Sequence, residues 1–302
     1  MKKKWVVFPV LLALVAAAGA YWIAAGSFQR TEGKFFDSNG VQIHYAEWGQ
    51  GDPVILVHGF AANFDVNWRA PGIVDELATE YRVIALDDRG HGKSARPEDA
   101  NAYGVEMVND VIRLMDHLQL PKAHVIGYSM GGFITLKMIA MYPDRLLSAA
   151  PCAAGWAEDT PEERARVEGL AASLEAGKGY GPLFAILEPG GKEPSALKVA
   201  AANAALNKMN DPKIMAKVIR SLQDLAVTEA DLRKNTVPVL SVVGSIDPLR
   251  NGIDRMVGVM QHHKAVFVEG GDHITTLENK DYVNALKEFL HAQRAQLSSK
   301  AA

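Results

Sequence analysis

The sequence has a single cysteine and no marked excess of charge of either sign. Because Cys152 is alone among 302 residues, an intramolecular disulfide and a cysteine-built metal cluster are both excluded. We expect Cys152 to be a packed thiol. The formal net charge is -3, and Lys and Arg do not cluster beyond the N-terminus, so the chain lacks the basic surface that nucleic acid requires. The fold must therefore rest on its hydrophobic core, and we predict no nucleic-acid partner.

Long apolar runs are also lacking, except at the N-terminus. "MKKK" precedes residues 5–25, which carry no charge and are long enough to cross a bilayer, since about 20 helical residues span it. We predict a signal peptide or an uncleaved membrane anchor over residues 1–27, with an apolar helix packed on the domain as a third interpretation. The first two interpretations place the rest of the chain outside the cytoplasm, periplasmic or extracellular. An anchor would bind the membrane through residues 5–25.

Beyond the N-terminus, short apolar runs alternate with longer stretches of helical periodicity. A hairpin is expected in "KFFDSNGVQIHYAEWG", where Asn39 and Gly40 suit a tight turn. Further strands are expected in "PVILV", "YRVIAL", "AHVIG", "LLSAAP", "VPVLSVVG" and "KAVFV". This alternation predicts an α/β fold with a mostly parallel sheet flanked by helices.

The pattern changes to alanine-rich helical segments between the fourth and fifth of these apolar runs. In "DTPEE", Thr160 can cap a helix and Glu163 would complete a capping box. We predict a helical cap over residues 155–235, inserted into one core domain formed by residues 28–154 and 236–298. Such an insert is typical of a lid over a site carried by the sheet.

A serine lies at the most crowded turn of the predicted sheet. In "GYSMGG", Ser129 is flanked by Gly127 and Gly131, after an expected strand and before an expected helix. A tight turn without chemistry is one interpretation. The strand and helix favour the other, a nucleophile elbow, in which larger side chains at the two glycines would clash. The helix that follows would direct its positive end at a developing oxyanion.

A nucleophilic serine needs a base, and the base needs an acid to orient it. Asp247 follows the strand expected in "VPVLSVVG", and His273 follows the strand expected in "KAVFV". Strand ends at one edge of a parallel sheet converge, so the three side chains could meet. Asp247 could instead be a turn residue in "IDP". Asp272, next to the histidine, is a weaker candidate for the acid.

The "HGF" turn after the strand "PVILV" offers part of an oxyanion hole. We predict that the amides of Phe60 and Met130 donate to the oxyanion. We interpret His58 as a residue that organises this loop, and His91 as one that could face the site. For five other histidines we expect ordinary satisfied or solvated rings: His44, His117, His124, His262 and His263.

These residues together resemble the α/β-hydrolase-fold family. The resemblance covers about residues 34 to 294 and includes His58-Gly59, "DDRGHGKS", the elbow at Ser129, Asp247 and His273. It implies an eight-stranded, mainly parallel sheet with a cap at the position of the helical insert. It also implies catalysis without a cofactor or metal, through an acyl-enzyme on Ser129 that water then hydrolyses.

The resemblance to this family leaves several functions open. A serine in place of the aspartate of epoxide and haloalkane hydrolases favours a serine hydrolase that cleaves carboxylic esters of small or medium acyl substrates. A carbon-carbon bond hydrolase of the meta-cleavage type is the nearest rival, and a non-catalytic ligand-binding protein is the alternative from another class. Four cap residues are candidates for the pocket wall: Trp156, Tyr180, Phe184 and Met209.

Overall fold

The computed structural model describes residues 30–157 and 160–301. The predicted signal peptide or anchor lies outside these residues. Within the described ranges, no helix combines the length and the apolar character that crossing a membrane would need.

One eight-stranded sheet runs through the molecule in the order β1-β2-β4-β3-β5-β6-β7-β8. Strands β1 and β2 form the predicted hairpin and β2 pairs antiparallel with β4, whereas all other neighbouring strands are parallel. The sheet confirms the predicted fold class. The strands are β1 (Lys34–Ser38), β2 (Val41–Trp48), β3 (Pro53–Val57), β4 (Arg82–Leu86), β5 (Ala123–Tyr128), β6 (Leu146–Cys152), β7 (Val239–Gly244) and β8 (His263–Val268).

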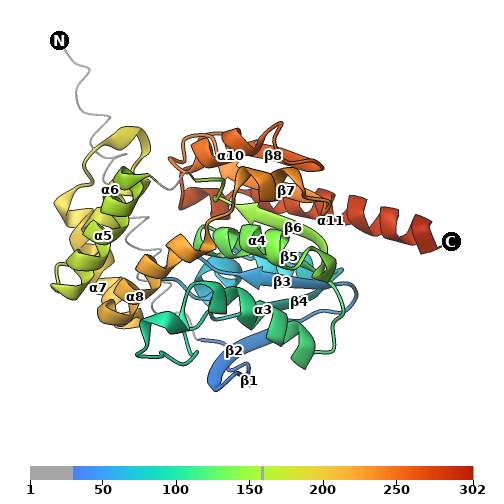
Figure 1. Cartoon of the computed structure of the whole chain (residues 1–302), viewed down its shortest axis with the longest axis horizontal. Helices are drawn as coiled ribbons and strands as arrows, with labels where there is room; N and C mark the ends of the chain where they lie inside the picture. Colours follow the sequence, from blue (N-terminus) through green and yellow to red (C-terminus); the bar gives the residue numbers. More distant parts are fainter. Residues whose placement is uncertain (1–29, 158–159, 302) are drawn as a thin grey trace, which may run out of the picture.

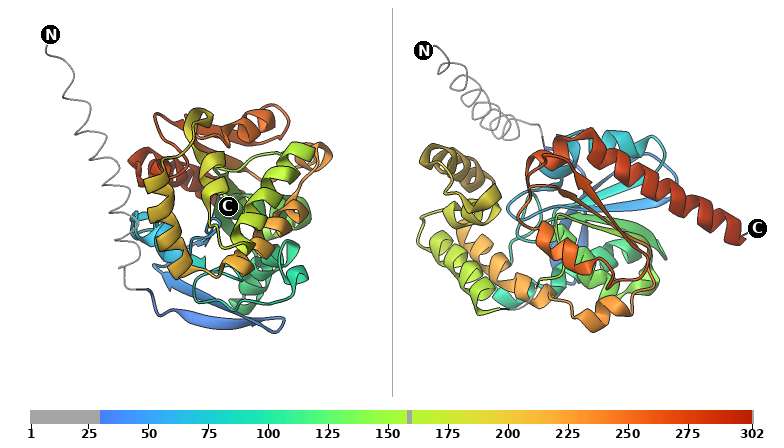
Figure 2. Two further views of the ribbon diagram at one scale, coloured as in Figure 1. Left: turned by 90° about the vertical axis from the view of Figure 1, so that its left-hand side faces the viewer. Right: turned by 90° about the horizontal axis from the view of Figure 1, so that it is seen from above.

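Helices cover both faces of the sheet, as Figure 2 shows from above. Helices α3 and α4 lie on one face, and α2 and α11 lie on the other. Strands β3, β5 and β7 are buried on both faces and rich in Val, Ile and Leu, as expected for parallel strands between two helical layers. The core helices are α2 (Ile73–Ala78), α3 (Val105–His117), α4 (Met130–Met141), α10 (Arg250–Met256) and α11 (Lys280–Ala301). The core also contains a short π-helix, η1 (Asp65–Arg69), and the 3₁₀ helices η2 (Ala100–Ala102), η3 (Pro143–Arg145) and η6 (Thr275–Glu278).

The segment between β6 and β7 forms a group of helices beside the sheet (Figure 1). As predicted, the described part of this segment contains helices and no strand. We call residues 160–233 of this group the cap; the exact limits of the cap domain remain a prediction. Its elements are α5 (Pro161–Glu175), α6 (Gly181–Leu187), η4 (Pro189–Gly191), α7 (Ala196–Met209), α8 (Pro212–Ser221), η5 (Leu222–Leu225) and α9 (Glu229–Arg233).

The beginning of α5 differs in part from the prediction. The Thr160 side chain accepts a hydrogen bond from the Glu163 amide, but among the described residues the reciprocal bond, from the Thr160 backbone N–H to the Glu163 carboxylate, is not present. A complete capping box occurs instead at α9, between Thr228 and Asp231. Glu163 forms an ion pair with Arg166, so its carboxylate is satisfied one turn further along the helix.

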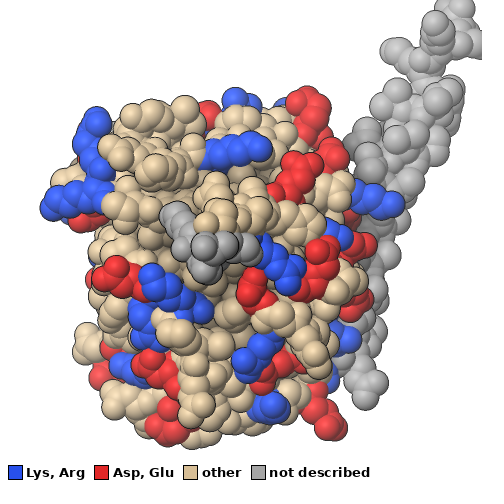
Figure 3. All heavy atoms as spheres, turned by 90° about the vertical axis from the view of Figure 1, so that its right-hand side faces the viewer, with Lys and Arg blue, Asp and Glu red and all other residues tan. Residues whose placement is uncertain are grey.

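Charged side chains of both signs are interspersed on the face drawn in Figure 3. In the cap, Arg220 of α8 pairs with Glu168 and Glu175 of α5 and ties the two helices together. Such exposed pairs contribute little stability individually, about 0–1 kcal/mol. The contact between α5 and α8 therefore depends mainly on buried side chains such as Leu170, Leu174 and Met215.

Candidate active site

Ser129 occupies a strained turn between β5 and α4. Its backbone has φ +54° and ψ -115°, a conformation that a non-glycine residue adopts only when its surroundings impose it. A Cβ atom at Gly127 would lie 1.9 Å from the Gly131 oxygen, and one at Gly131 would lie 2.1 Å from the Val57 oxygen. The crowding inferred from "GYSMGG" is therefore backbone against backbone, which no side-chain movement can relieve.

The three residues predicted to form a triad are joined by two hydrogen bonds. Ser129 Oγ lies 2.9 Å from His273 Nε2, and His273 Nδ1 lies 2.8 Å from Asp247 Oδ2. They follow β5, β7 and β8, whose carboxyl ends meet at one edge of the sheet. Asp247 accepts a hydrogen bond from the protonated Nδ1 of His273, which leaves Nε2 free to receive the serine proton.

The loop that carries His273 is fixed by neighbours on both sides. Tyr128 Oη donates to the His273 carbonyl over 2.8 Å, and burial raises the pKa of Tyr128 well above its usual value, so the phenol keeps its proton. Asp272 turns away and accepts hydrogen bonds from the amides of Ile274 and Thr275. Burial raises the pKa of Asp272, but these hydrogen bonds outweigh the burial and lower it overall. Asp272 therefore shapes the turn, while Asp247 contacts the imidazole.

The turn after β3 lies against Ser129 and carries the Phe60 amide. Gly59 approaches so closely that a Cβ there would lie 3.3 Å from Ser129 Cβ. The Gly59 amide donates to Asn67 Oδ1 at 2.6 Å. Among the described residues, the amides of Phe60 and Met130 have no hydrogen-bond acceptor. Both donors that we predicted for the oxyanion hole are therefore available to a ligand.

Two buried histidines brace this turn from the core. His58 Nε2 accepts from the Asp88 amide at 3.0 Å, so Nδ1 carries the proton and donates to the Gly59 oxygen at 2.8 Å. His91 Nε2 accepts from the Ala61 amide at 3.2 Å. Burial lowers the pKa of His58, and burial lowers the pKa of His91 to about 3, so both rings are neutral. His58 thus organises the loop as predicted, and His91 supports the site without contacting Ser129.

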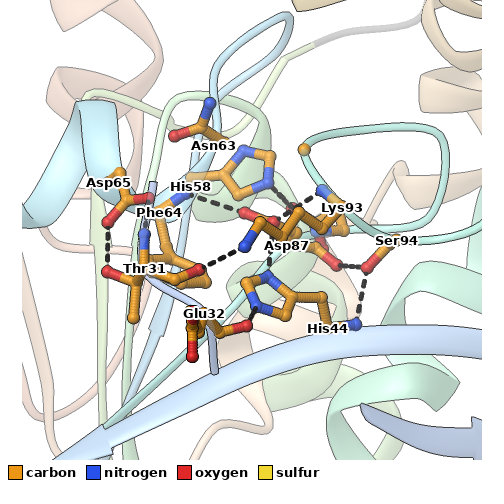
Figure 4. Close-up of polar contacts among 12 residues, drawn as sticks. Thr31, Glu32, His44, His58, Asn63, Phe64, Asp65, Asp87, Lys93 and Ser94 are labelled. Carbon is orange, nitrogen blue, oxygen red and sulfur yellow. Dashed lines mark hydrogen bonds and ion pairs between the residues drawn. The ribbon is translucent and has the colours of Figure 1, made fainter. Parts of the chain in front are cut away.

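A second polar cluster lies behind this loop, around Asp87 (Figure 4). The Asp87 carboxylate accepts from His44 Nδ1 and from the amides of Phe64 and Lys93. Burial raises the pKa of Asp87, but the bond from His44 and its other partners lower it overall. The other ring nitrogen of His44 faces the Glu32 carbonyl at 2.7 Å. This cluster therefore joins the "DDRGHGKS" loop to the start of the described chain.

Two cavities meet at Ser129. The larger has a volume of about 240 Å³ and is lined mainly by apolar side chains, among them Phe133 of the core and Leu170 of the cap. The smaller cavity has a volume of about 90 Å³, and His273 and Asn67 are among the residues that line it. Phe60, Leu183 and Leu187 line both cavities, whereas His273 lines only the smaller one and Met130 only the larger one. Ser129 thus borders a larger, mainly apolar cavity on one side and a smaller cavity beside His273 on the other.

The cap wall differs from the expectation. Of the four residues proposed to line the pocket, only Phe184 borders these two cavities. Tyr180 is fully buried, Met209 packs against Ala62 and Val66, and Trp156 packs on the main core. The sequence interpretation also missed Asn67 and Asn210, whose partners lie on other loops. Within the described ranges, no group of three or more His, Cys, Asp or Glu side chains could hold a metal ion.

Comparison with known proteins agrees with the observed fold. Residues 52–174 match the family model of the alpha/beta hydrolase fold. The chain is 38% identical over 128 residues to the dihydrolipoyllysine-residue acetyltransferase component of the acetoin cleaving system of Cupriavidus necator, a match that covers 42% of this chain and 32% of that protein. It is 26% identical over 263 residues to 3-oxoadipate enol-lactonase 2 of Acinetobacter baylyi, covering 81% and 91% of the two chains.

A solved structure matches nearly the whole described domain. The meta-cleavage product hydrolase of Pseudomonas fluorescens IP01 superposes with a TM-score of 0.65 at 25% identity, covering 86% of this chain and 98% of that chain. The chain spans about a third of the length of the acetyltransferase component. The family-model match, the sheet order and the strand-end site agree that this chain has the α/β-hydrolase fold.

Proposed function

We propose that this protein is a serine hydrolase that cleaves carboxylic esters through an acyl-enzyme. The observation that carries the proposal is the hydrogen-bonded series from Ser129 through His273 to Asp247, with Ser129 bordering an apolar cavity. A serine hydroxyl becomes a nucleophile when a positioned base takes its proton and an acid orients that base.

The reaction follows from the positions of these groups. Ser129 Oγ attacks the ester carbonyl carbon while its proton passes to His273 Nε2, and the carbonyl oxygen becomes an oxyanion facing the amides of Phe60 and Met130. The carbon-oxygen bond to the alcohol then breaks, and His273 returns the proton to the departing alkoxide. Water then attacks the acyl-enzyme and gives its proton to His273. His273 returns this proton to Ser129 Oγ as the bond between Oγ and the acyl carbon breaks, which releases the acid and regenerates the Ser129 hydroxyl.

The two cavities support an assignment of the two halves of the substrate. His273 must reach the leaving alcohol, and it borders the small cavity, so we assign the alcohol to that side. The acyl chain then occupies the apolar cavity bordered by Met130. Taking about 30 Å³ for one water-sized group, the larger cavity has room for about eight such groups and the smaller for about three. The expected substrates are esters of a medium apolar acid with a short alcohol.

An isomeric pair of esters tests this assignment. Methyl heptanoate and hexyl acetate have the same composition, but they place the six-carbon chain on opposite sides of the carbonyl. We expect methyl heptanoate to be hydrolysed with the higher kcat/KM, together with labelling of Ser129 by a fluorophosphonate. Faster cleavage of hexyl acetate would reverse the assignment of the cavities, and absence of both hydrolysis and labelling would contradict a serine hydrolase.

A carbon-carbon bond hydrolase remains the second candidate. The resemblance to the meta-cleavage product hydrolase favours it, whereas the enol-lactonase, named for a lactone and hence for a cyclic ester, favours ester cleavage. Turnover of a vinylogous diketone above that of methyl heptanoate would support the second candidate.

We also propose that the protein is exported and is either processed or anchored through residues 5–25. Support comes from the charge-free run behind "MKKK". Separation of cells expressing the full chain into membrane and soluble fractions distinguishes an anchor from a cleaved signal peptide, and retention in the cytoplasm would contradict both.

A further inference from the structure

We infer that Asn210, at the end of cap helix α7, positions the Phe60 amide, so that the oxyanion hole is assembled by the core and the cap together. This inference rests on the proposed function, because it assumes that the Phe60 amide receives the oxyanion.

The contact joins the cap to the loop beside Ser129. Asn210 Nδ2 donates to the Ala61 carbonyl over 2.8 Å, and the Asn210 side chain is buried. The same nitrogen lies 3.3 Å from the Leu206 carbonyl, so two acceptors face this end of the amide and fix which end is the donor. Among the described residues, Asn210 Oδ1 has no partner. The side chain therefore has one strong polar contact, and that contact is with the core loop.

Ala61 needs such support because its backbone is strained. Its φ of +57° lies in the left-handed region, which is unfavourable for a residue with a Cβ atom. The core holds the Ala61 amide through His91, and the cap holds the Ala61 carbonyl through Asn210. The two peptide planes that meet at Ala61 are thus each fixed by one side chain.

Rigid peptide planes carry this restraint to Phe60. The Ala61 carbonyl and the Ala62 amide share one plane, so Asn210 orients both. The Ala62 amide donates to the Gly59 carbonyl at 3.3 Å. The Gly59 carbonyl in turn shares a plane with the Phe60 amide. Asn210 is therefore two hydrogen bonds away from the donor that we assign to the oxyanion.

Packing keeps Asn210 in this place. Met209, the preceding residue, packs against Ala62 of this loop and against Val66 of η1. Arg96 of the core donates to the Met209 carbonyl at 3.1 Å. The junction of α7 and α8 thus packs on the loop after β3 that carries Phe60 and Ala61. Displacement of this part of the cap would remove the hydrogen-bond donor to the Ala61 carbonyl.

The test compares two variants of Asn210 with a matched cap asparagine. Asn210→Ala removes the donor, and Asn210→Asp removes the N–H groups while it keeps the shape. Asn203→Ala is the control, because Asn203 also lies on α7 but accepts from the Tyr180 amide within the cap. Each protein is assayed for kcat and KM with methyl heptanoate. Hydrogen exchange is measured for the peptide covering residues 58–64.

We expect both Asn210 variants to lose about tenfold in kcat with little change in KM, since loss of a whole oxyanion donor typically costs 10²- to 10³-fold. Exchange in residues 58–64 should rise in these variants and stay unchanged in Asn203→Ala. An unchanged kcat together with unchanged exchange would overturn the inference, and so would an equal fall in Asn203→Ala. If the wild-type protein cleaves no ester, the proposed function fails, and the exchange measurement alone decides whether Asn210 holds the loop.

Discussion

The edge of the sheet and the cap both line the cavity at Ser129, but they contribute different chemistry. The edge supplies buried polar groups joined by short hydrogen bonds, such as Asp247 and His273. The cap supplies mainly apolar side chains, such as Phe184 and Leu206, and it reaches the loop beside Ser129 through the Asn210 amide. We therefore expect changes at the edge to alter turnover and changes in the apolar side chains of the cap to alter which substrate fits, with Asn210 as the cap residue that acts on turnover.

Glycines show the same difference in terms of packing. A Cβ at Gly127, beside the nucleophile, would meet backbone atoms at 1.9 Å, whereas a Cβ at Gly169 in cap helix α5 would meet nothing within 4 Å. Interiors packed at crystal density cannot absorb such a clash without moving the backbone. The comparison teaches that the elbow admits very little change in shape, while much of the cap surface admits substitution.

Substitution of the nucleophile should have the largest effect. Ser129→Ala removes the attacking oxygen, and loss of a triad serine costs on the order of 10⁶-fold in turnover. The fold should persist, because alanine fits wherever the serine side chain fits. Ester hydrolysis and fluorophosphonate labelling measure the first effect, and thermal unfolding measures the second.

A second buried serine–histidine pair provides the control. Ser148 Oγ lies 2.7 Å from His124 Nδ1 inside the sheet, away from both cavities at Ser129. Ser148→Ala should keep its turnover even if the variant is less stable. Equal losses of turnover in Ser129→Ala and Ser148→Ala would show that activity depends only on stability. The proposed difference in catalytic contribution between the sheet edge and the cap would then be wrong.

The acid should have the next largest effect. Asp247→Asn keeps the shape but removes the charge that orients His273 and stabilises its imidazolium form, so we expect turnover to fall about 10⁴-fold. Asp272→Asn is the matched comparison, because Asp272 adjoins the histidine in sequence but accepts hydrogen bonds from its own turn. We expect a small loss of stability and less than a tenfold change in turnover. A greater loss of turnover in Asp272→Asn would reverse the assignment.

Local pattern was sufficient to predict the elements that carry the site. Buried strands have apolar runs, and Ser129, Asp247 and His273 each follow one of them. Because parallel strands end at the same edge, chain order alone brings the three side chains together. The glycines beside Ser129 support the same prediction, because few residues larger than glycine fit such a crowded turn between a strand and a helix.

Contacts across the chain could not be predicted in this way. Asn210 and Ala61 are 149 positions apart, and nothing in the neighbourhood of either residue indicates the other. The apolar positions of the cap are equally ambiguous, because an apolar side chain can face the core, another helix or a cavity. Tyr180 faces the core and Phe184 the cavity, although only one turn of helix separates them.

The ionisable groups differ between the two regions as well. All nine histidines of the chain lie outside residues 155–235, so the cap has none. Burial lowers the pKa of His124 to about 4, which leaves the ring neutral inside the sheet. Burial raises the pKa of Asp88 well above its usual value, so the contribution of Asp88 to stability increases as the pH falls, whereas that of His124 decreases. The contribution of one histidine is therefore best measured as a difference between two proteins.

The smallest predicted effect is the acid sensitivity that His124 gives to the core. Between pH 6.5 and about 4 the unfolded chain protonates this imidazole and the folded chain does not, so its contribution to stability falls as the pH falls. The free energy of unfolding should therefore drop by about 1.4 kcal/mol per pH unit more steeply in the wild type than in His124→Asn. Urea unfolding at pH 7.5, 6.5, 5.5 and 4.5 measures both slopes. Asn203→Ala in the cap should keep the wild-type slope, and equal slopes in all three proteins would show that His124 carries no such sensitivity.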